Sequence, residues 1–315
     1  MDRVRRQLGL TKEYVYLGDK SDVTIAVLDS GVASHPDLKD RIVAFHDFSG
    51  RIQKDGKRHG SFRPYDDYGH GTHVCGILAG NGGLSNGRYR GIIPEAKLVV
   101  GKILDARGDG AAEDMIEGMR WILDVREKYG VRLLNLSVGI SNTTKKEKQE
   151  KLYVMLNALS EAGILVICAA GNQGPGQGSL SFLGAGNFVI SVGCDDGEYF
   201  KGDPARCEYH SGRGRRGTIL RKPDVVAPGT KISSCSSLCQ NASCGNGYER
   251  RSGTSMATPI VTGCLGRVLQ INQNLSNWEL KRLLTSTATD LHKPWNQQGY
   301  GMICPQAMLQ KAMKA

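Results

Sequence analysis

Val23-Thr-Ile-Ala-Val-Leu28 is a continuous apolar run that stops at the turn residues Asp29-Ser30-Gly31. Such a run is typical of a strand that is buried on both faces of a parallel sheet. Similar runs recur at 43–48, 96–103, 132–138, 164–169 and 188–193. Helical spacing is found at 69–79, from 110 onward, and at 145–162, 254–270 and 278–287. The alternation predicts an α/β fold, with one doubly wound, mostly parallel sheet flanked by helices on both faces.

The length and composition of the chain fit one large domain. Its 315 residues are 40% hydrophobic and 23% charged, which is ordinary for a globular protein. No internal repeat or long linker divides the pattern, so we expect an N-terminal extension at 1–21 and a single domain at 22–315. No apolar run approaches the ~20 residues that a membrane span needs, and we therefore expect no membrane partner.

The formal net charge of +10 first suggests a nucleic-acid partner. However, the basic residues are scattered along the chain, and no DNA- or RNA-binding motif accompanies them. We therefore predict no nucleic-acid partner. A preference for acidic partners or substrates is the more modest inference.

Nine cysteines are present, so at least one cannot pair within the chain. Cys75, Cys168, Cys194 and Cys264 fall in apolar stretches, where a free cysteine behaves as a small buried residue. The spacing of 235, 239 and 244 favours a disulfide or free thiols over a zinc site. This usage, and a start that lacks a signal-peptide core, predict a cytoplasmic protein; a secreted one requires that a leader has been removed.

Polar residues follow the predicted strands or open the predicted helices. Asp29, Ser137 and Asn172 each come at the carboxyl end of a strand, while His70 and Ser255 open buried helices. Ligands of such sheets bind outside the carboxyl ends of the strands. We therefore expect these five side chains to gather at one edge of the sheet.

Each of these residues also has an ordinary structural interpretation. Ser255 could cap its helix by accepting backbone N–H bonds. Asp29 in Asp-Ser-Gly and Asn172 in Gly-Asn-Gln-Gly could be turn residues. Alternatively, the end of the buried helix could present the Ser255 hydroxyl as a nucleophile, with a backbone N–H nearby for an oxyanion.

Four motifs favour the second interpretation. They are Val-Leu-Asp-Ser-Gly at 27–31, His-Gly-Thr-His-Val at 70–74, Ala-Ala-Gly-Asn at 169–172 and Gly-Thr-Ser-Met-Ala-Thr-Pro at 253–259. With them the chain resembles the subtilases, the subtilisin-like serine peptidases, from about residue 22 to residue 288. The resemblance implies a serine endopeptidase with a subtilisin-like fold.

The resemblance also implies the roles of the site residues. Ser255 would be the nucleophile and His70 its general base, and Asp29 would hold the imidazole tautomer. Asn172 would donate to the oxyanion together with the backbone N–H of Ser255. His73, three positions after the matched histidine, is expected to be structural.

Substrate binding follows from the same resemblance. An extended peptide would pair as an added strand with Ser137, Val138 and Gly139. Gly108, Asp109 and Gly110 would form the opposite wall of the channel.

The chemistry needs no cofactor. Subtilases often bind calcium near the loop at 80–91, but this loop offers Asn81 and Asn86 and no carboxylate, so a structural calcium is possible but not supported. Asp37 could supply one ligand, and we predict no metal site.

Two alternatives to the peptidase remain. A non-cleaving peptide-binding or regulatory protein could share the fold, although all three members of the triad are present. A nucleotide-binding enzyme would need a Gly-rich phosphate loop after the first strand, and Asp29-Ser-Gly-Val-Ala-Ser is no such loop.

Overall fold

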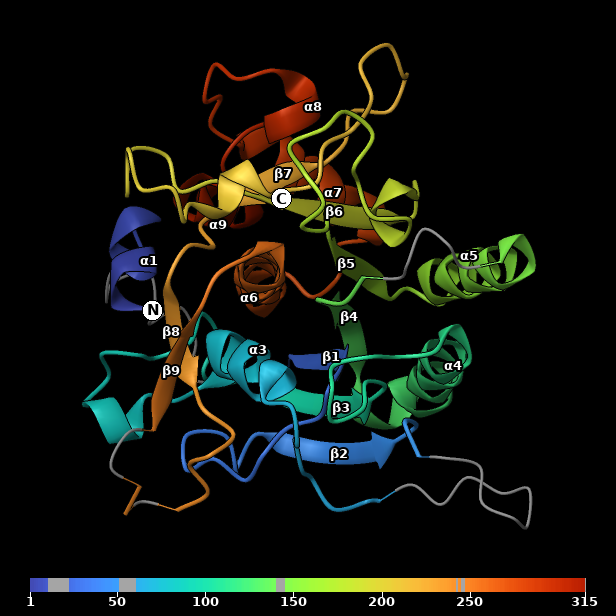
Figure 1. Ribbon diagram of the computed structural model, residues 1–315, viewed down its shortest axis with the longest axis vertical. Coiled ribbons are helices and arrows are strands. Elements are labelled where there is room, and N and C mark those ends of the chain that lie inside the picture. Colours follow the sequence, from blue (N-terminus) through green and yellow to red (C-terminus); the bar gives the residue numbers. More distant parts are fainter. Residues whose placement is uncertain (11–22, 51–60, 140–144, 242, 245–246, 315) are drawn as a thin grey trace.

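A seven-stranded parallel sheet forms the centre of the molecule, in the order β2-β3-β1-β4-β5-β6-β7 (Figure 1). The structure is a computed structural model that describes residues 1–10, 23–50, 61–139, 145–241, 243–244 and 247–314. The strands are β1 (Thr24–Asp29), β2 (Ile42–Asp47), β3 (Lys97–Lys102), β4 (Val131–Leu136), β5 (Leu165–Ala169), β6 (Val189–Cys194) and β7 (Val225–Ala227). The six predicted strands are confirmed, and the seventh was missed because its three residues are too few to make a recognisable run.

Helices cover both faces of the sheet, as predicted. In Figure 1, α3 (His70–Ala79) and α6 (Thr254–Ile271) lie on one side, and α4 (Ala112–Tyr129) and α5 (Lys146–Glu161) lie on the other. The remaining helices are α1 (Asp2–Gln7), α7 (Asn277–Thr287), α8 (Trp295–Gln298) and α9 (Pro305–Ala312). The capping box expected at the start of α7 is present: the Ser276 hydroxyl and the Glu279 carboxylate each accept from the other's backbone N–H.

The core consists of two apolar clusters, one on each face of the sheet. The first cluster packs the sheet against α3 and α6, and the second packs it against α4 and α5. All six residues of β1 are buried, which explains why its sequence is continuously apolar rather than alternating.

The strand order contains one switch point, between the neighbours β1 and β4. From β1 the chain crosses toward the β2 edge, whereas from β4 it continues toward β7. Crevices at such points are the usual ligand sites of open α/β sheets. Asp29 ends β1 and Ser137 follows β4, so both lie at this crevice.

A second, antiparallel pair of strands, β8 (Ile232–Cys235) and β9 (Tyr248–Arg251), leads into α6. The sequence indicated only a loop-rich stretch between the sixth strand and Ser255. These two strands carry charged and small polar residues, and no residue of β9 is fully buried. They therefore lack the apolar pattern of the central strands.

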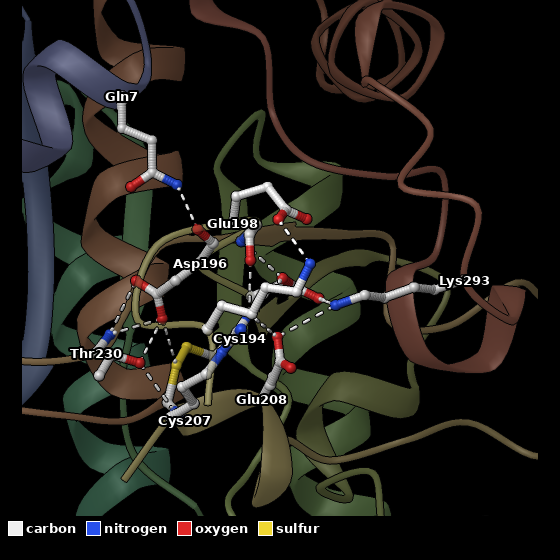
Figure 2. A network of polar contacts seen from close by, with 12 residues as sticks. Gln7, Cys194, Asp196, Glu198, Cys207, Glu208, Thr230 and Lys293 are labelled. Carbon is white, nitrogen blue, oxygen red and sulfur yellow. Dashed lines mark hydrogen bonds and ion pairs between the residues drawn. A yellow bond between two sulfur atoms is a disulfide. The ribbon is translucent and has the colours of Figure 1, made fainter. Parts of the chain in front are cut away.

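The N-terminal residues pack on the same body. Val4 and Leu8 belong to the first apolar cluster, and Arg3 forms an ion pair of 3.0 Å with the buried Asp196. In Figure 2 the side chain of Gln7 points to Asp196, whose backbone oxygen accepts a hydrogen bond of 2.9 Å from it. The predicted division between residues 21 and 22 falls in the segment 11–22, outside the described residues, and stays a prediction.

Two cysteine pairs are disulfide-bonded. Cys239 and Cys244 are joined and Cys235 is free, so the disulfide is the one of the two expected alternatives that is present in that group. The expectation that Cys194 is free is wrong, because Cys207, 13 residues later in the chain, is disulfide-bonded to it (Figure 2). Disulfides persist mainly in oxidising compartments, so these pairs count against the cytoplasmic location, which stays a prediction.

Candidate active site

The carboxylate of Asp29 and the imidazole of His70 meet at the end of β1. The Nδ1–H of His70, the first residue of α3, donates to Asp29 Oδ1 over 2.7 Å. The backbone N–H of Ser30 donates to the same oxygen, also over 2.7 Å. Asp29 is fully buried, and its Oδ2 has no hydrogen-bond partner among the described residues. The imidazole is therefore the group that chiefly compensates this buried charge.

The pKa of His70 is raised above the ordinary value of 6.5. Burial by itself would lower this pKa, but the negative charge of Asp29 and the hydrogen bond to it outweigh burial. His70 is therefore a stronger base than a free histidine. By contrast, burial lowers the pKa of His73 to about 3, and its Nε2–H donates to the carbonyl of Ile232, so His73 is structural, as expected.

Ser255 lies in the first turn of α6 and does not cap it. Gly253 occupies the N-cap position, and the Ser255 hydroxyl accepts no capping bond from the first turn of the helix. The Ser255 hydroxyl instead donates to the carbonyl oxygen of Ser137 over 2.8 Å. In the part of the chain that the structure describes, the hydroxyl and the His70 imidazole are not hydrogen-bonded to each other. The capping interpretation is therefore excluded, and the hydroxyl is held at the carboxyl end of β4.

Asn172 is oriented by the residue that precedes Ser255. Its Oδ1 accepts from both the backbone N–H and the hydroxyl of Thr254, over 3.1 Å each. Because a backbone N–H can only donate, the oxygen of this amide must face α6. The Asn172 NH₂ group is left to donate beside the N-terminus of α6, where the first backbone N–H groups have no partner inside the helix.

Asp66 organises this site, although the sequence analysis did not single it out. Its Oδ1 accepts from the backbone N–H of Gly69 over 2.7 Å and from the Ser30 hydroxyl over 2.9 Å. Its Oδ2 accepts from the backbone N–H and the hydroxyl of Thr72. One carboxylate thus ties the start of α3 to the residue after Asp29. An aspartate four residues before a helix-opening histidine was the available signal.

The predicted substrate residues belong to two segments, one that directly follows β4 and one that closely precedes α4. Ser137 is held by Asn135, whose amide donates to its hydroxyl over 2.9 Å and in turn accepts from Thr262 of α6. A side chain added at Gly139 would meet open space, whereas one added at Gly108 would run into the ring of Tyr68. Asp109 lies in the exposed turn that carries Gly108 and Gly110.

Neither candidate metal group in the described residues suits calcium. His35, Asp37 and Cys235 lie together, but the Asp37 carboxylate already accepts from Leu84 N–H at 3.1 Å and from the Tyr248 hydroxyl at 2.6 Å. Both ring nitrogens of His35 are also hydrogen-bonded. The second group is built on the Cys194–Cys207 disulfide. Calcium needs six to eight free oxygen ligands, which these groups do not supply.

This arrangement defines an α/β serine hydrolase: a parallel sheet, a buried carboxylate–imidazole pair and a serine in the first turn of a buried helix. The sequence matches the profile of the subtilase family over residues 20–302. The chain belongs to the subtilase family, and the predicted family and subtilisin-like fold are confirmed. It is a serine endopeptidase domain.

Three relatives illustrate the similarity. Serine protease AprX of Bacillus subtilis (strain 168) is 36% identical over 293 residues, which cover 89% of this chain and 64% of AprX. Subtilisin Savinase of Lederbergia lenta is 31% identical over 288 residues, covering 91% of this chain and 90% of Savinase. The solved structure of Sphericase has a TM-score of 0.75 at 26% identity, covering 92% of this chain and 96% of Sphericase.

Proposed function

We propose that this protein hydrolyses peptide bonds through an acyl-enzyme on Ser255, with His70 as general base and Asp29 as its partner. The observation that carries the proposal is the 2.7 Å bond between His70 Nδ1 and Asp29 Oδ1. This bond places the proton on Nδ1 and leaves Nε2 as the basic nitrogen. An imidazole in this tautomer can accept the proton of a serine hydroxyl.

The reaction begins when the Ser255 hydroxyl leaves the Ser137 carbonyl and turns to His70. Its oxygen forms a bond to the carbonyl carbon of the substrate while Nε2 takes the proton. The negative charge on the former carbonyl oxygen is met by the Ser255 backbone N–H and the Asn172 NH₂. The C–N bond then breaks, and the amine leaves with the proton from His70. Water, deprotonated by the same imidazole, releases the acid and regenerates Ser255.

The substrate binds as an extended strand beside Ser137, Val138 and Gly139. Support for this arrangement comes from the position of these residues directly after β4, at the switch point of the sheet. An incoming peptide would displace the Ser255 hydroxyl from Ser137 and free it to act. Gly108, Asp109 and Gly110 form the other wall, where Tyr68 packs over Gly108.

Substitution of the proposed nucleophile tests this mechanism. Ser255→Ala should abolish peptide hydrolysis and covalent labelling by a sulfonyl fluoride, because it removes the proposed nucleophilic oxygen. Ser252→Ala is the matched control: this exposed serine is three residues earlier, and the variant should keep both properties. Undiminished turnover in Ser255→Ala would refute the assignment. A folded wild-type protein that is neither labelled nor active would support the non-cleaving alternative.

A further inference from the structure

A cavity beside the β8–β9 pair is lined by basic residues that are far apart in the sequence. It has a volume of about 240 Å³, and its cations are Arg3, Arg6, Arg88, Lys231 and Arg250. They come from α1, from the loop before β3 and from the hairpin that leads into α6. Basic residues that looked scattered along the chain are thus gathered into one site by the fold.

The charges of this cavity are only partly neutralised. Arg3 pairs with Asp196, Arg6 with Asp2, and Lys231 with Asp203. Arg88 and Arg250 are exposed, and neither forms an ion pair with a described residue. Asp2 is the single carboxylate among the described lining residues. The cavity therefore carries net positive charge and two guanidinium groups that have no carboxylate partner among the described residues.

The aromatic rings of the cavity are not available for stacking. The Arg88 guanidinium lies 5.4 Å from the centre of the Tyr89 ring. Arg3 and Lys231 lie 4.8 and 5.4 Å from the centre of the Phe200 ring. Proteins that bind single-stranded nucleic acid need open rings for the bases, and here cations occupy them. A site with guanidinium groups but no open aromatic ring instead suits carboxylates, which guanidinium groups bind through paired hydrogen bonds.

We propose that this cavity binds the carboxylate side chains of an acidic peptide segment, as a site separate from the catalytic crevice. Successive side chains of a strand point to opposite faces. Arg251 points to the crevice, where its guanidinium lies 5.8 Å from the centre of the Tyr68 ring, and Arg250 points to the cavity. The two sites therefore share β9, and the cavity would give acidic segments of a substrate or partner a second contact.

Direct binding tests the site without any need for turnover. The probe is a fluorescein-labelled peptide with four glutamates, and fluorescence anisotropy is measured with the Ser255→Ala protein so that the probe stays intact. The double variant Arg88→Gln/Arg250→Gln should weaken binding at least about tenfold, because it removes the guanidinium groups of both residues. Added salt should weaken binding to the parent protein, since the site is open to solvent.

Two controls separate this site from general charge effects. Arg120→Gln/Lys151→Gln changes the net charge equally, and both residues lie on α4 and α5, across the sheet from the cavity. This variant should bind like the parent, and a peptide with glutamine in place of glutamate should not bind. Absence of glutamate-peptide binding, equal binding to both double variants, or tighter binding of an oligothymidylate would overturn the proposal. None of these results would bear on Ser255, because binding requires no cleavage.

Discussion

Two opposing effects act on the protonation of His70. Burial disfavours the imidazolium, whereas the carboxylate of Asp29 favours it and prevails, so the pKa lies above its ordinary value. A general base acts only in its neutral form. The proposed catalytic cycle therefore needs a pH high enough to deprotonate His70 against the pull of Asp29.

The pH dependence of activity follows from this balance. We expect kcat/KM to rise with pH, with a midpoint above the 6.5 of an ordinary histidine. In Asp29→Asn the carboxylate charge is gone and burial prevails, so the midpoint should fall, and kcat should drop by about 10⁴. The measurement is initial rate against pH for both proteins. An unshifted midpoint in the variant would contradict the assigned role of Asp29.

The N-terminus of α3 approaches the loop after β1 more closely than a side chain allows. A Cβ at Gly71 would lie 2.1 Å from the backbone oxygen of Gly31. Gly31 has φ of +111° and is itself packed against the backbone of Tyr65. The backbone of this loop cannot yield easily, so the distance between Asp29 and His70 depends on these two glycines.

Gly71→Ala should therefore weaken the fold and the site together. We expect the free energy of unfolding to fall by about 1–3 kcal/mol, the usual cost of overpacking, as α3 is pushed from β1. A shift of about 1 Å at His70 can also cost about 10² in kcat. Denaturant unfolding and kinetics measure the two effects. Gly176→Ala is the control: Gly176 is exposed, no atom lies within 4 Å of an added Cβ, and its unfolding free energy should not change.

On the scale of the whole molecule, the Asp37 carboxylate, a possible calcium ligand, already accepts hydrogen bonds from protein groups. Asp37 joins three distant segments, because its carboxylate accepts from Leu84 and Tyr248. The Asn81 Oδ1 of the same region accepts from the backbone N–H of Gly83. The loop at 80–91 is thus held by hydrogen bonds between protein groups.

A calcium chelator should consequently leave the protein unchanged. We expect the same Tm and the same rate of peptide hydrolysis with and without the chelator, because no coordination bond is lost. Asp37→Ala, which removes the hydrogen bonds themselves, should lower the Tm in either condition. A Tm that falls with chelator and recovers with calcium would show that the loop rearranges to bind the ion.

Asp29, His70, Asn172 and Ser255 could be singled out because strand ends and helix starts are visible in the sequence, and the motifs give their order. Asp66 was missed because its function depends on Ser30 and Thr72, which reach it only after folding. The basic cavity was missed for the same reason.

The sequence by itself determined the layers of this protein: apolar runs of strand length and helical spacing leave one way to bury both faces of the sheet. It also determined which residue types stand at the strand ends. Only the tertiary structure decided the hydrogen-bond partners, such as the Ser137 carbonyl for Ser255, the disulfide between Cys194 and Cys207, and the gathering of basic residues from α1 and β9. Periodicity is local and readable along the chain, whereas these contacts join segments whose proximity arises from packing the whole core.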